Sequence, residues 1–271
     1  MMRRVIIYGV LIGLACVMLL PFAWLLRSSL CDEAAVIQPL ESWRDFIPPA
    51  LHFENFARVF RSVPLMLYLR NTVFITALGI VGTLLSSSLC AYAFAFCRLP
   101  YRNAIFYCVI GTVMLPGVVT MIPTFILFRE LGWIDTFKPL IVPAFFGSAF
   151  AIFLFRQFFL GLPVEVIEAA RMDGATPLQT YWLIVLPMSR PVCVTVALFS
   201  FVGHWNDFMG PLIYLNSQEK WTLQLGLNSF RGEIVDQTNL LMACAVLILI
   251  PVVIAFFSPN GISFAARICP G

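Results

Sequence analysis

The sequence has little charge. Charged residues make up 11% of its 271 residues and hydrophobic residues 61%, whereas roughly 25% and 50% are typical of soluble domains. This balance excludes a soluble, disordered, collagenous or coiled-coil chain. The net charge of +3 is too small to indicate a polyanionic partner such as nucleic acid.

Motifs for enzyme chemistry are also missing. There is no Gly-x-x-x-x-Gly-Lys-Ser/Thr run, so the chain lacks the phosphate-binding loop needed to hydrolyse ATP itself. Neither His-Glu-x-x-His nor Gly-x-Ser-x-Gly occurs, and His52 and His204 are too far apart in sequence to form a local pair. The eight cysteines show no metal or redox spacing, and those inside apolar runs are expected to pack as small side chains. We therefore expect no catalytic, metal or cofactor site in this chain.

Charge is absent altogether from six apolar runs of 16 to 30 residues. Their lengths are close to the roughly 20 residues with which an α-helix crosses a bilayer core of about 30 Å. Apolar residues follow one another directly in these runs, whereas barrel strands alternate. We therefore expect an all-α integral membrane protein with six transmembrane helices, near residues 5–26, 71–96, 104–128, 139–160, 191–212 and 239–257.

An even number of spans places both chain ends on one side of the membrane. Arg3 and Arg4 precede the first run and favour an inside N-terminus. That run continues ten residues beyond Cys16, too far for a signal peptide, so we expect an uncleaved first span. We expect one transmembrane domain over residues 1–271, with a loop on the outer side at about 27–70, a cytoplasmic loop at about 161–190 and a cytoplasmic tail at about 258–271.

Proline and glycine interrupt the third and fourth predicted spans. A proline inside a helix removes one backbone hydrogen bond and pushes on the preceding turn, so these spans should be bent or locally unwound. Broken helices commonly line transport pathways, although they also occur in membrane proteins that transport nothing. The interrupting residues are Gly111, Pro116, Gly117, Pro123, Pro143 and Gly147.

The loop at 161–190 carries the signals of two helices. The first has Pro163 at a first-turn position and Glu165 near its positive end, and it stops at Gly174. At 100° per residue, Glu165 and Glu168 lie on one side and small residues on the other. Small side chains let another backbone approach closely, so this helix is typical of one inserted into a partner, although a loop packed only on its own bundle fits equally well. The small face holds Ala169, Ala170, Asp173 and Gly174.

The second helix of this loop begins with a capping box. Thr176 and Gln179 supply the box, and Pro177 stands at the first helical position. Apolar residues then recur every three or four positions until Pro187 and Pro191 end the run, which predicts an amphipathic helix along the membrane face. The predicted stripe consists of Leu178, Tyr181, Trp182, Val185 and Leu186.

The same loop carries a family resemblance. Glu168, Ala169 and Ala170, then Gly174, and then Ile184 to Pro187 stand at the spacing of the EAA loop in permease subunits of bacterial ABC importers. The chain is similar to the carbohydrate-type branch, which includes maltose and glycerol 3-phosphate permeases. The similarity extends through residues 70–72, 91–93, 122–123, 155–159, 205–208, 211–212 and 223–227.

This resemblance implies six helices in a bacterial inner membrane, with both termini cytoplasmic. The implied partners are a second permease in a heterodimer, two ATPase subunits that use ATP and Mg²⁺, an extracytoplasmic solute-binding protein and the lipid bilayer, without nucleic acid. The implied cargo is a sugar or sugar phosphate, and no residue is assigned to bind it. The implied coupling residues are Glu168, Ala169, Ala170, Asp173 and Gly174, on a scaffold of Pro163, Thr176, Pro177, Ile184, Leu186 and Pro187.

Two other functions stay open from the residues themselves. An ion-coupled secondary transporter would need a buried charge network and more spans. An intramembrane enzyme would need more than Asp207, the one candidate intramembrane acid, which we expect to lie at a helix end. The C-terminus departs from the family pattern, because residues 258–271 carry Arg267 as their only charge where relatives have an aromatic and basic tail.

Overall fold

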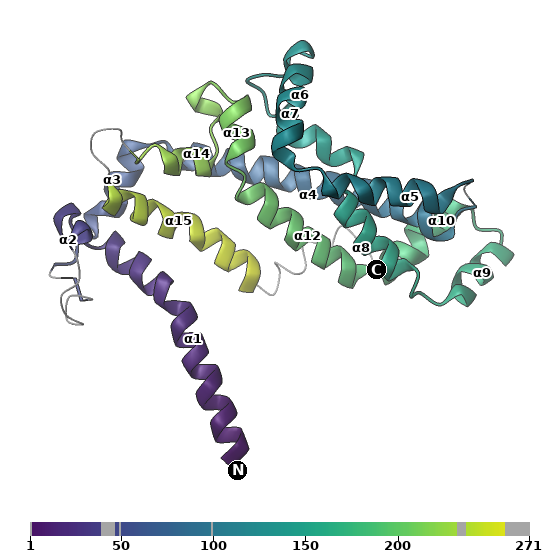
Figure 1. The fold of residues 1–271 in the computed structure, drawn as a ribbon, viewed down its shortest axis with the longest axis horizontal. Coiled ribbons are helices and arrows are strands. Elements are labelled where there is room, and N and C mark those ends of the chain that lie inside the picture. Colours follow the sequence, from purple (N-terminus) through teal and green to yellow (C-terminus); the bar gives the residue numbers. More distant parts are fainter. Residues whose placement is uncertain (1, 39–46, 49, 99, 232–236, 258–271) are drawn as a thin grey trace. The chain divides into compact units, whose positions relative to one another are not determined.

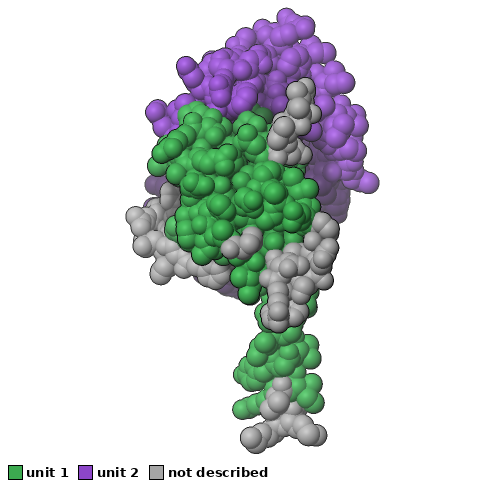
Figure 2. All heavy atoms as spheres, turned by 90° about the vertical axis from the view of Figure 1, so that its left-hand side faces the viewer, with its two compact units in different colours: residues 1–66, 225–254 green, residues 67–224, 255–271 purple. Residues whose placement is uncertain are grey.

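The computed structural model describes residues 2–38, 47–48, 50–98, 100–231 and 237–257. Within these ranges the chain forms helices and no β-strand, as the apolar runs predicted (Figure 1). Two compact units are coloured separately in Figure 2: residues 1–66 with 225–254, and residues 67–224 with 255–271. The single domain over 1–271 stays a prediction, and the tail at 258–271 lies outside the described residues.

The first unit contains α1 (Met2–Ser29), α2 (Glu33–Ile37), α3 (Glu54–Ser62) and most of α15 (Thr238–Phe257). Asn55 on α3 is buried, and its Nδ2 donates to the carbonyl oxygens of Ser29 and Cys31 at 3.0 and 2.9 Å. These bonds hold α3 at the C-terminal end of α1. The carboxylate of Glu33 accepts a hydrogen bond from the backbone nitrogen of Thr238 at 3.0 Å, which satisfies an amide at the start of α15.

The second unit is organised along α4 (Leu65–Phe96), the longest helix in the described part of the chain (Figure 1). The helix α14 (Leu223–Asn228) lies where the chain passes from one unit to the other. The other helices of the second unit are α5 (Arg102–Gly111), α6 (Gly117–Glu130), α7 (Lys138–Ile141), α8 (Ala149–Phe159), α9 (Val164–Met172), α10 (Pro177–Thr180), α11 (Leu186–Met188), α12 (Arg190–Trp205) and α13 (Met209–Tyr214). Between them lie the 3₁₀ turns η2 (Thr112–Met114), η3 (Val142–Phe146) and η5 (Gln218–Lys220) and the π-helical turn η4 (Tyr181–Val185).

The core of the second unit is rich in aromatic side chains from α4, α5 and α8. Phe155 and Phe159 on α8 are fully buried. The expectation that cysteines pack as small side chains is confirmed for Cys193 in this core and for Cys244 on α15, both fully buried. It does not hold for every cysteine in an apolar run, because Cys16 and Cys108 are exposed.

Three helices among the described residues are long and apolar enough to cross a bilayer: Ile6–Ser29, Leu65–Phe96 and Lys138–Phe159. Two bent pairs would raise this number to five if each crosses as one span: Arg102–Met114 with Gly117–Glu130, and Pro177–Met188 with Arg190–Trp205. Thr238–Ile254 is apolar but shorter. These helices support a multi-pass membrane protein, and the count of six spans stays a prediction.

The third and fourth predicted spans are broken, as their prolines and glycines predicted. The third bends by 98° between η2 and α6, where Pro116 precedes the first residue of α6. The fourth is interrupted by η3, which contains Pro143 and ends at Gly147 with φ of +91°. A positive φ of this size is accessible to glycine at little cost, so Gly147 permits the chain to leave η3 and begin α8.

Hydroxyl groups of α4 satisfy backbone groups that this break frees. Ser86 Oγ donates to the carbonyl oxygen of Ala144 at 3.0 Å, and the backbone nitrogen of Ser148 donates to Ser87 Oγ at 3.0 Å. An unpaired backbone group is costly inside a bilayer, so the two serines allow irregular backbone at this depth.

Candidate functional site

The loop at 161–190 folds as α9 followed by a second helical segment, as its sequence predicted. α9 begins after Pro163, which occupies the N-cap with φ of −60° and ψ of 119° rather than the first turn. Glu165 lies in the first turn and Arg171 in the last, so each charge opposes the partial charge of its helix end. Each such arrangement typically stabilises a helix by about 0.3–1 kcal/mol.

α9 ends in a Schellman motif built on Gly174. The amide of Ala175 donates to the carbonyl oxygen of Ala170 at 3.0 Å, and the amide of Gly174 donates to that of Arg171 at 3.1 Å. Gly174 is exposed and has φ of +81°, a left-handed conformation that costs a residue with a side chain roughly 1–2 kcal/mol. A Cβ atom at this position would meet nothing within 4 Å. Glycine is therefore favoured here by the backbone conformation and not by a lack of space for a side chain.

The small residues of α9 point in two directions. Ala170 and Ile167 are buried, with 7% and 3% of their surface exposed, and Ile167 belongs to the core of the second unit. Glu168, Ala169 and Asp173 are exposed. The predicted bare face is therefore divided: Ala170 lets α9 pack closely on its own chain, and Ala169 is open to contact with another molecule.

The second segment begins with the predicted capping box. Gln179 N donates to Thr176 Oγ1 at 3.3 Å, and Thr176 N donates to Gln179 Oε1 at 2.8 Å. Pro177 occupies the first helical position, where its missing amide costs no hydrogen bond. Because only Ala175 separates Gly174 from this cap, the direction of α10 after α9 is closely fixed.

A wider turn follows α10. Pro187 has no amide hydrogen to offer the carbonyl group four residues earlier, and the helix adopts the π-turn η4. The amide of Leu186 bonds there to the carbonyl oxygen of Tyr181, five residues back. The hydroxyl groups of Tyr181 and Ser88 lie 2.7 Å apart and are buried, which anchors this turn on α4.

The apolar residues of this segment are divided between the protein interior and its surface. Tyr181, Val185 and Leu186 are buried, and Ile184 and Pro187 are half-buried. Leu178 and Trp182 are exposed, and the amphipathic helix along the membrane face stays a prediction. A π-turn holds more residues than an α-helical turn, so η4 shifts the face that this segment buries.

Arg171 is a residue that the sequence analysis did not select. Its Nη2 donates at 3.1 Å to the carbonyl oxygen of Phe96 at the end of α4. Arg102 Nη1 donates at 3.3 Å to the carbonyl oxygen of Ala95 in the same turn. Both guanidinium groups therefore meet the negative end of the α4 dipole, and Arg171 ties α9 to α4. In the sequence, Arg171 is a basic residue directly after Glu-Ala-Ala. Its hydrogen-bond partner lies 75 residues away in the chain, and local residue spacing does not predict such a contact.

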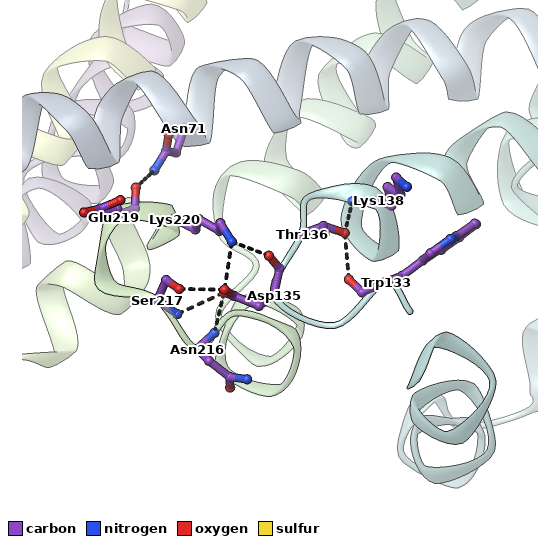
Figure 3. A network of polar contacts seen from close by, with 9 residues as sticks. All are labelled: Asn71, Trp133, Asp135, Thr136, Lys138, Asn216, Ser217, Glu219 and Lys220. Atoms are coloured by element: carbon purple, nitrogen blue, oxygen red, sulfur yellow. Dashed lines mark hydrogen bonds and ion pairs between the residues drawn. The ribbon is translucent and has the colours of Figure 1, made fainter. Parts of the chain in front are cut away.

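A second polar cluster lies near the start of α4 (Figure 3). Asp135, between α6 and α7, accepts hydrogen bonds from Lys220 Nζ at 2.7 Å and Ser217 Oγ at 2.6 Å. These two donors hold the pKa of Asp135 well below its usual range, so the carboxylate is ionised at neutral pH. Asn71 on α4 donates to the carbonyl oxygen of Glu219 at 2.9 Å, so the connection that carries Lys220 is also fixed to α4.

These two clusters lie toward opposite ends of one helix. Asn71 and Phe96 are separated by about 37 Å at a rise of 1.5 Å per residue. The apolar core of a bilayer is about 30 Å thick. A crossing of the bilayer by α4 would therefore put the Asp135 cluster and α9 on different aqueous sides.

The described residues gather no metal centre: in this part of the chain no three His, Cys, Asp or Glu side chains are placed to hold an ion. Asp207 lies at a helix end, as expected. Its Oδ1 accepts a hydrogen bond at 3.0 Å from the backbone nitrogen of Gly210, in the first turn of α13.

Comparisons with known proteins place the chain among transport components. Residues 87–262 match the family described as binding-protein-dependent transport system inner membrane component. The arabinooligosaccharides transport system permease protein AraQ of Halalkalibacterium halodurans is 34% identical, over 78% of this chain and 76% of its own length. The sn-glycerol-3-phosphate transport system permease protein UgpE of Salmonella choleraesuis is 33% identical, over 90% and 88%.

The fold has a solved relative as well. A chain in the crystal structure of a bacterial ABC transporter involved in the import of the acidic polysaccharide alginate superposes with a TM-score of 0.79. It is 28% identical, and the alignment covers 93% of both chains.

Proposed function

The chain belongs to the family of binding-protein-dependent transport system inner membrane components, and from this membership we propose that it is a permease subunit of an ATP-driven importer. The observation that carries the coupling mechanism is α9, an exposed helix with the EAA motif that is docked on the core and on the end of α4. No observation favours an ion-coupled transporter or an intramembrane enzyme.

The surface around α9 supports its role as the contact with an ATPase subunit. Leu160, Val164 and Met172 are apolar residues that lie exposed before, at the start of and at the end of this helix. A group of exposed apolar residues beside charged ones is typical of a protein interface. Glu168 offers its carboxylate to the partner, and Ala169 leaves room for the partner's backbone to approach.

Movement of α9 passes into the membrane helices through two attachments. Ile167 is packed in the core with Phe155 and Phe159 of α8, and Arg171 is bonded to the last residue of α4. Protein interiors are closely packed and transmit displacement. When ATP binding closes the ATPase subunits, α9 moves with them and shifts the adjoining ends of α4 and α8. Coupling also requires that the two membrane states bind the ATPase differently.

The topology proposed with this mechanism has six spans, both termini and α9 in the cytoplasm, and the Asp135 cluster outside. The distance of about 37 Å between Asn71 and Phe96 on α4 is long enough to cross a bilayer core of about 30 Å, as this arrangement requires. The proposed complex contains this chain, a second permease, two ATPase subunits and an extracytoplasmic binding protein. The binding protein delivers a sugar or sugar phosphate, and the ATPase subunits use ATP and Mg²⁺.

Co-purification tests this function. The full chain is tagged in its native membrane and extracted in mild detergent, and we expect an ATPase and a second permease to be retained. In proteoliposomes, the solute-loaded binding protein should stimulate ATP hydrolysis by this complex. Isolation of the chain without an ATPase, or solute uptake by the chain alone without nucleotide, would contradict the proposal.

A further inference from the structure

A cavity of about 440 Å³ opens within the second unit, between α12, α8 and the broken segment η3. Sites for small molecules typically measure about 300–1,000 Å³. Thr83 on α4 lines this cavity, and at 1.5 Å per residue it lies about 18 Å from Asn71 and about 20 Å from Phe96. The cavity is therefore near mid-depth of the bilayer and beside a broken helix, a common position for transport sites.

Hydroxyl and imidazole groups form one wall of the cavity. His204 Nδ1 lies 2.8 Å from the carbonyl oxygen of Ser200, and a carbonyl can only accept, so Nδ1 carries the hydrogen. The other ring nitrogen, Nε2, lies against Gly79 of α4, where a Cβ atom would come within 2.3 Å of it. Ser200 Oγ donates to Thr83 Oγ1 at 3.4 Å, a long bond that a ligand hydroxyl can replace with shorter ones. The hydroxyl groups of Ser200 and Thr83 therefore let this wall both donate and accept hydrogen bonds.

Aromatic faces form a second wall. Phe150 on α8 and Phe199 on α12 meet edge to face, with ring centroids 5.5 Å apart and planes at 89°. Both line the cavity and are exposed. The C–H face of a sugar ring packs well on an aromatic face, while its hydroxyl groups point sideways to polar partners. Saccharide sites combine these two kinds of wall.

The charges in the cavity disfavour an anion. None of the described residues that line it is lysine or arginine, and Asp207 brings a carboxylate to it. A phosphate or uronate would enter this space without a cation to pair with, and burying an unpaired charge is costly. The hydroxyl groups of a neutral sugar would find partners in Ser200 and Thr83.

We propose that this cavity holds one ring of a neutral saccharide during translocation. The proposal rests on the importer function and narrows its cargo from sugars and sugar phosphates to neutral sugars. It distinguishes this chain from a relative that carries sn-glycerol 3-phosphate and from a transporter that imports alginate, because both of those cargoes are acidic.

The test uses the complete importer in proteoliposomes with its own binding protein and ATP. One sample receives a pool of labelled neutral di- and trisaccharides, and another receives phosphorylated and uronic-acid saccharides of the same size. We expect accumulation from the neutral pool only. Uptake from the acidic pool, or from neither pool while the binding protein still stimulates ATP hydrolysis, would overturn the inference. No stimulation and no uptake would instead refute the importer function itself.

A matched pair of variants then ties uptake to the cavity. Ser200→Ala should lower the rate of neutral uptake about three- to tenfold, the range of one neutral hydrogen bond. It should leave stimulated ATP hydrolysis unchanged, because the side chain of Ser200 bonds to Thr83 and His204 and not to α9. Thr195→Ala removes a hydroxyl group from the exposed side of the same helix, outside the cavity, and should leave uptake unchanged. Equal uptake by the Ser200→Ala variant and the parent would contradict the assignment.

Discussion

Placing leucine at Ala169 or at Ala170 should produce two different defects, although the residues are adjacent. Ala170 is 7% exposed and packs inward, whereas Ala169 is exposed. The same side chain added at both positions therefore tests which direction each residue faces. We expect Ala170→Leu to loosen α9 and Ala169→Leu to impair only the contact with the ATPase.

The magnitudes follow from burial and helix length. Extra methylene groups in a packed interior typically cost about 1–3 kcal/mol, whereas leucine and alanine differ by less than about 0.7 kcal/mol in an exposed helix. α9 has nine residues, and an isolated helix of that length is only marginally stable in water. Loss of docking at Ala170 should therefore unfold α9, and Ala169→Leu should leave it intact.

Hydrogen exchange and ATP hydrolysis separate the two defects. In the purified complex, amides of Val164–Met172 should exchange faster in Ala170→Leu and at the parent rate in Ala169→Leu. Hydrolysis stimulated by the binding protein should fall in both variants, by about tenfold or more in Ala169→Leu if the lost contact contributes about 1.4 kcal/mol. Faster exchange in Ala169→Leu, or full stimulation there, would refute the division of the small face.

Three further outcomes are expected. Gly174→Ala should destabilise the end of α9 by about 1–2 kcal/mol, seen as faster amide exchange there, and an unchanged rate would contradict the need for a positive φ. Thr176→Ala removes one half of the capping box with Gln179, and the amides of the following turn should lose about 1 kcal/mol of protection. The pKa of Asp135 is lower in the folded state than in the unfolded state, where it is about 4. The bond to Lys220 therefore stabilises the folded state fully above about pH 4, and this stabilisation is lost as the pH falls through the folded-state pKa. Thermal unfolding of Asp135→Asn should therefore depend less on pH in the acid range than that of the parent; an identical pH profile would argue against this ion pair.

The sequence predicted the helices better than their contacts. Long charge-free runs identify α1, α4 and α15, because a bilayer span needs continuous apolar residues. Pro116 and Gly147 mark the breaks, because their backbone constraints act locally. The capping box at Thr176 was equally readable, since both of its partners lie within one turn.

The directions of the side chains were not predictable in the same way. A helical wheel gives the angle between Ala169 and Ala170 but not the direction of the core, which depends on where α9 docks. The π-turn at Tyr181–Val185 changes the residue period, so a wheel with 3.6 residues per turn does not give the buried face beyond it. The bond from Arg171 to Phe96 joins segments far apart in sequence, and it becomes visible only in the folded chain.

Site-directed photo-cross-linking from position 169 tests the coupling role of α9 most directly. A photoreactive amino acid replaces Ala169 in membranes that hold the complete importer, and the same group at Phe60, on the exposed side of α3, serves as the control. The expected result is an adduct between this chain and the ATPase subunit from position 169 and none from position 60. No ATPase adduct from position 169, or labelling of that position by a membrane-impermeant reagent added outside intact spheroplasts, would contradict the proposed coupling.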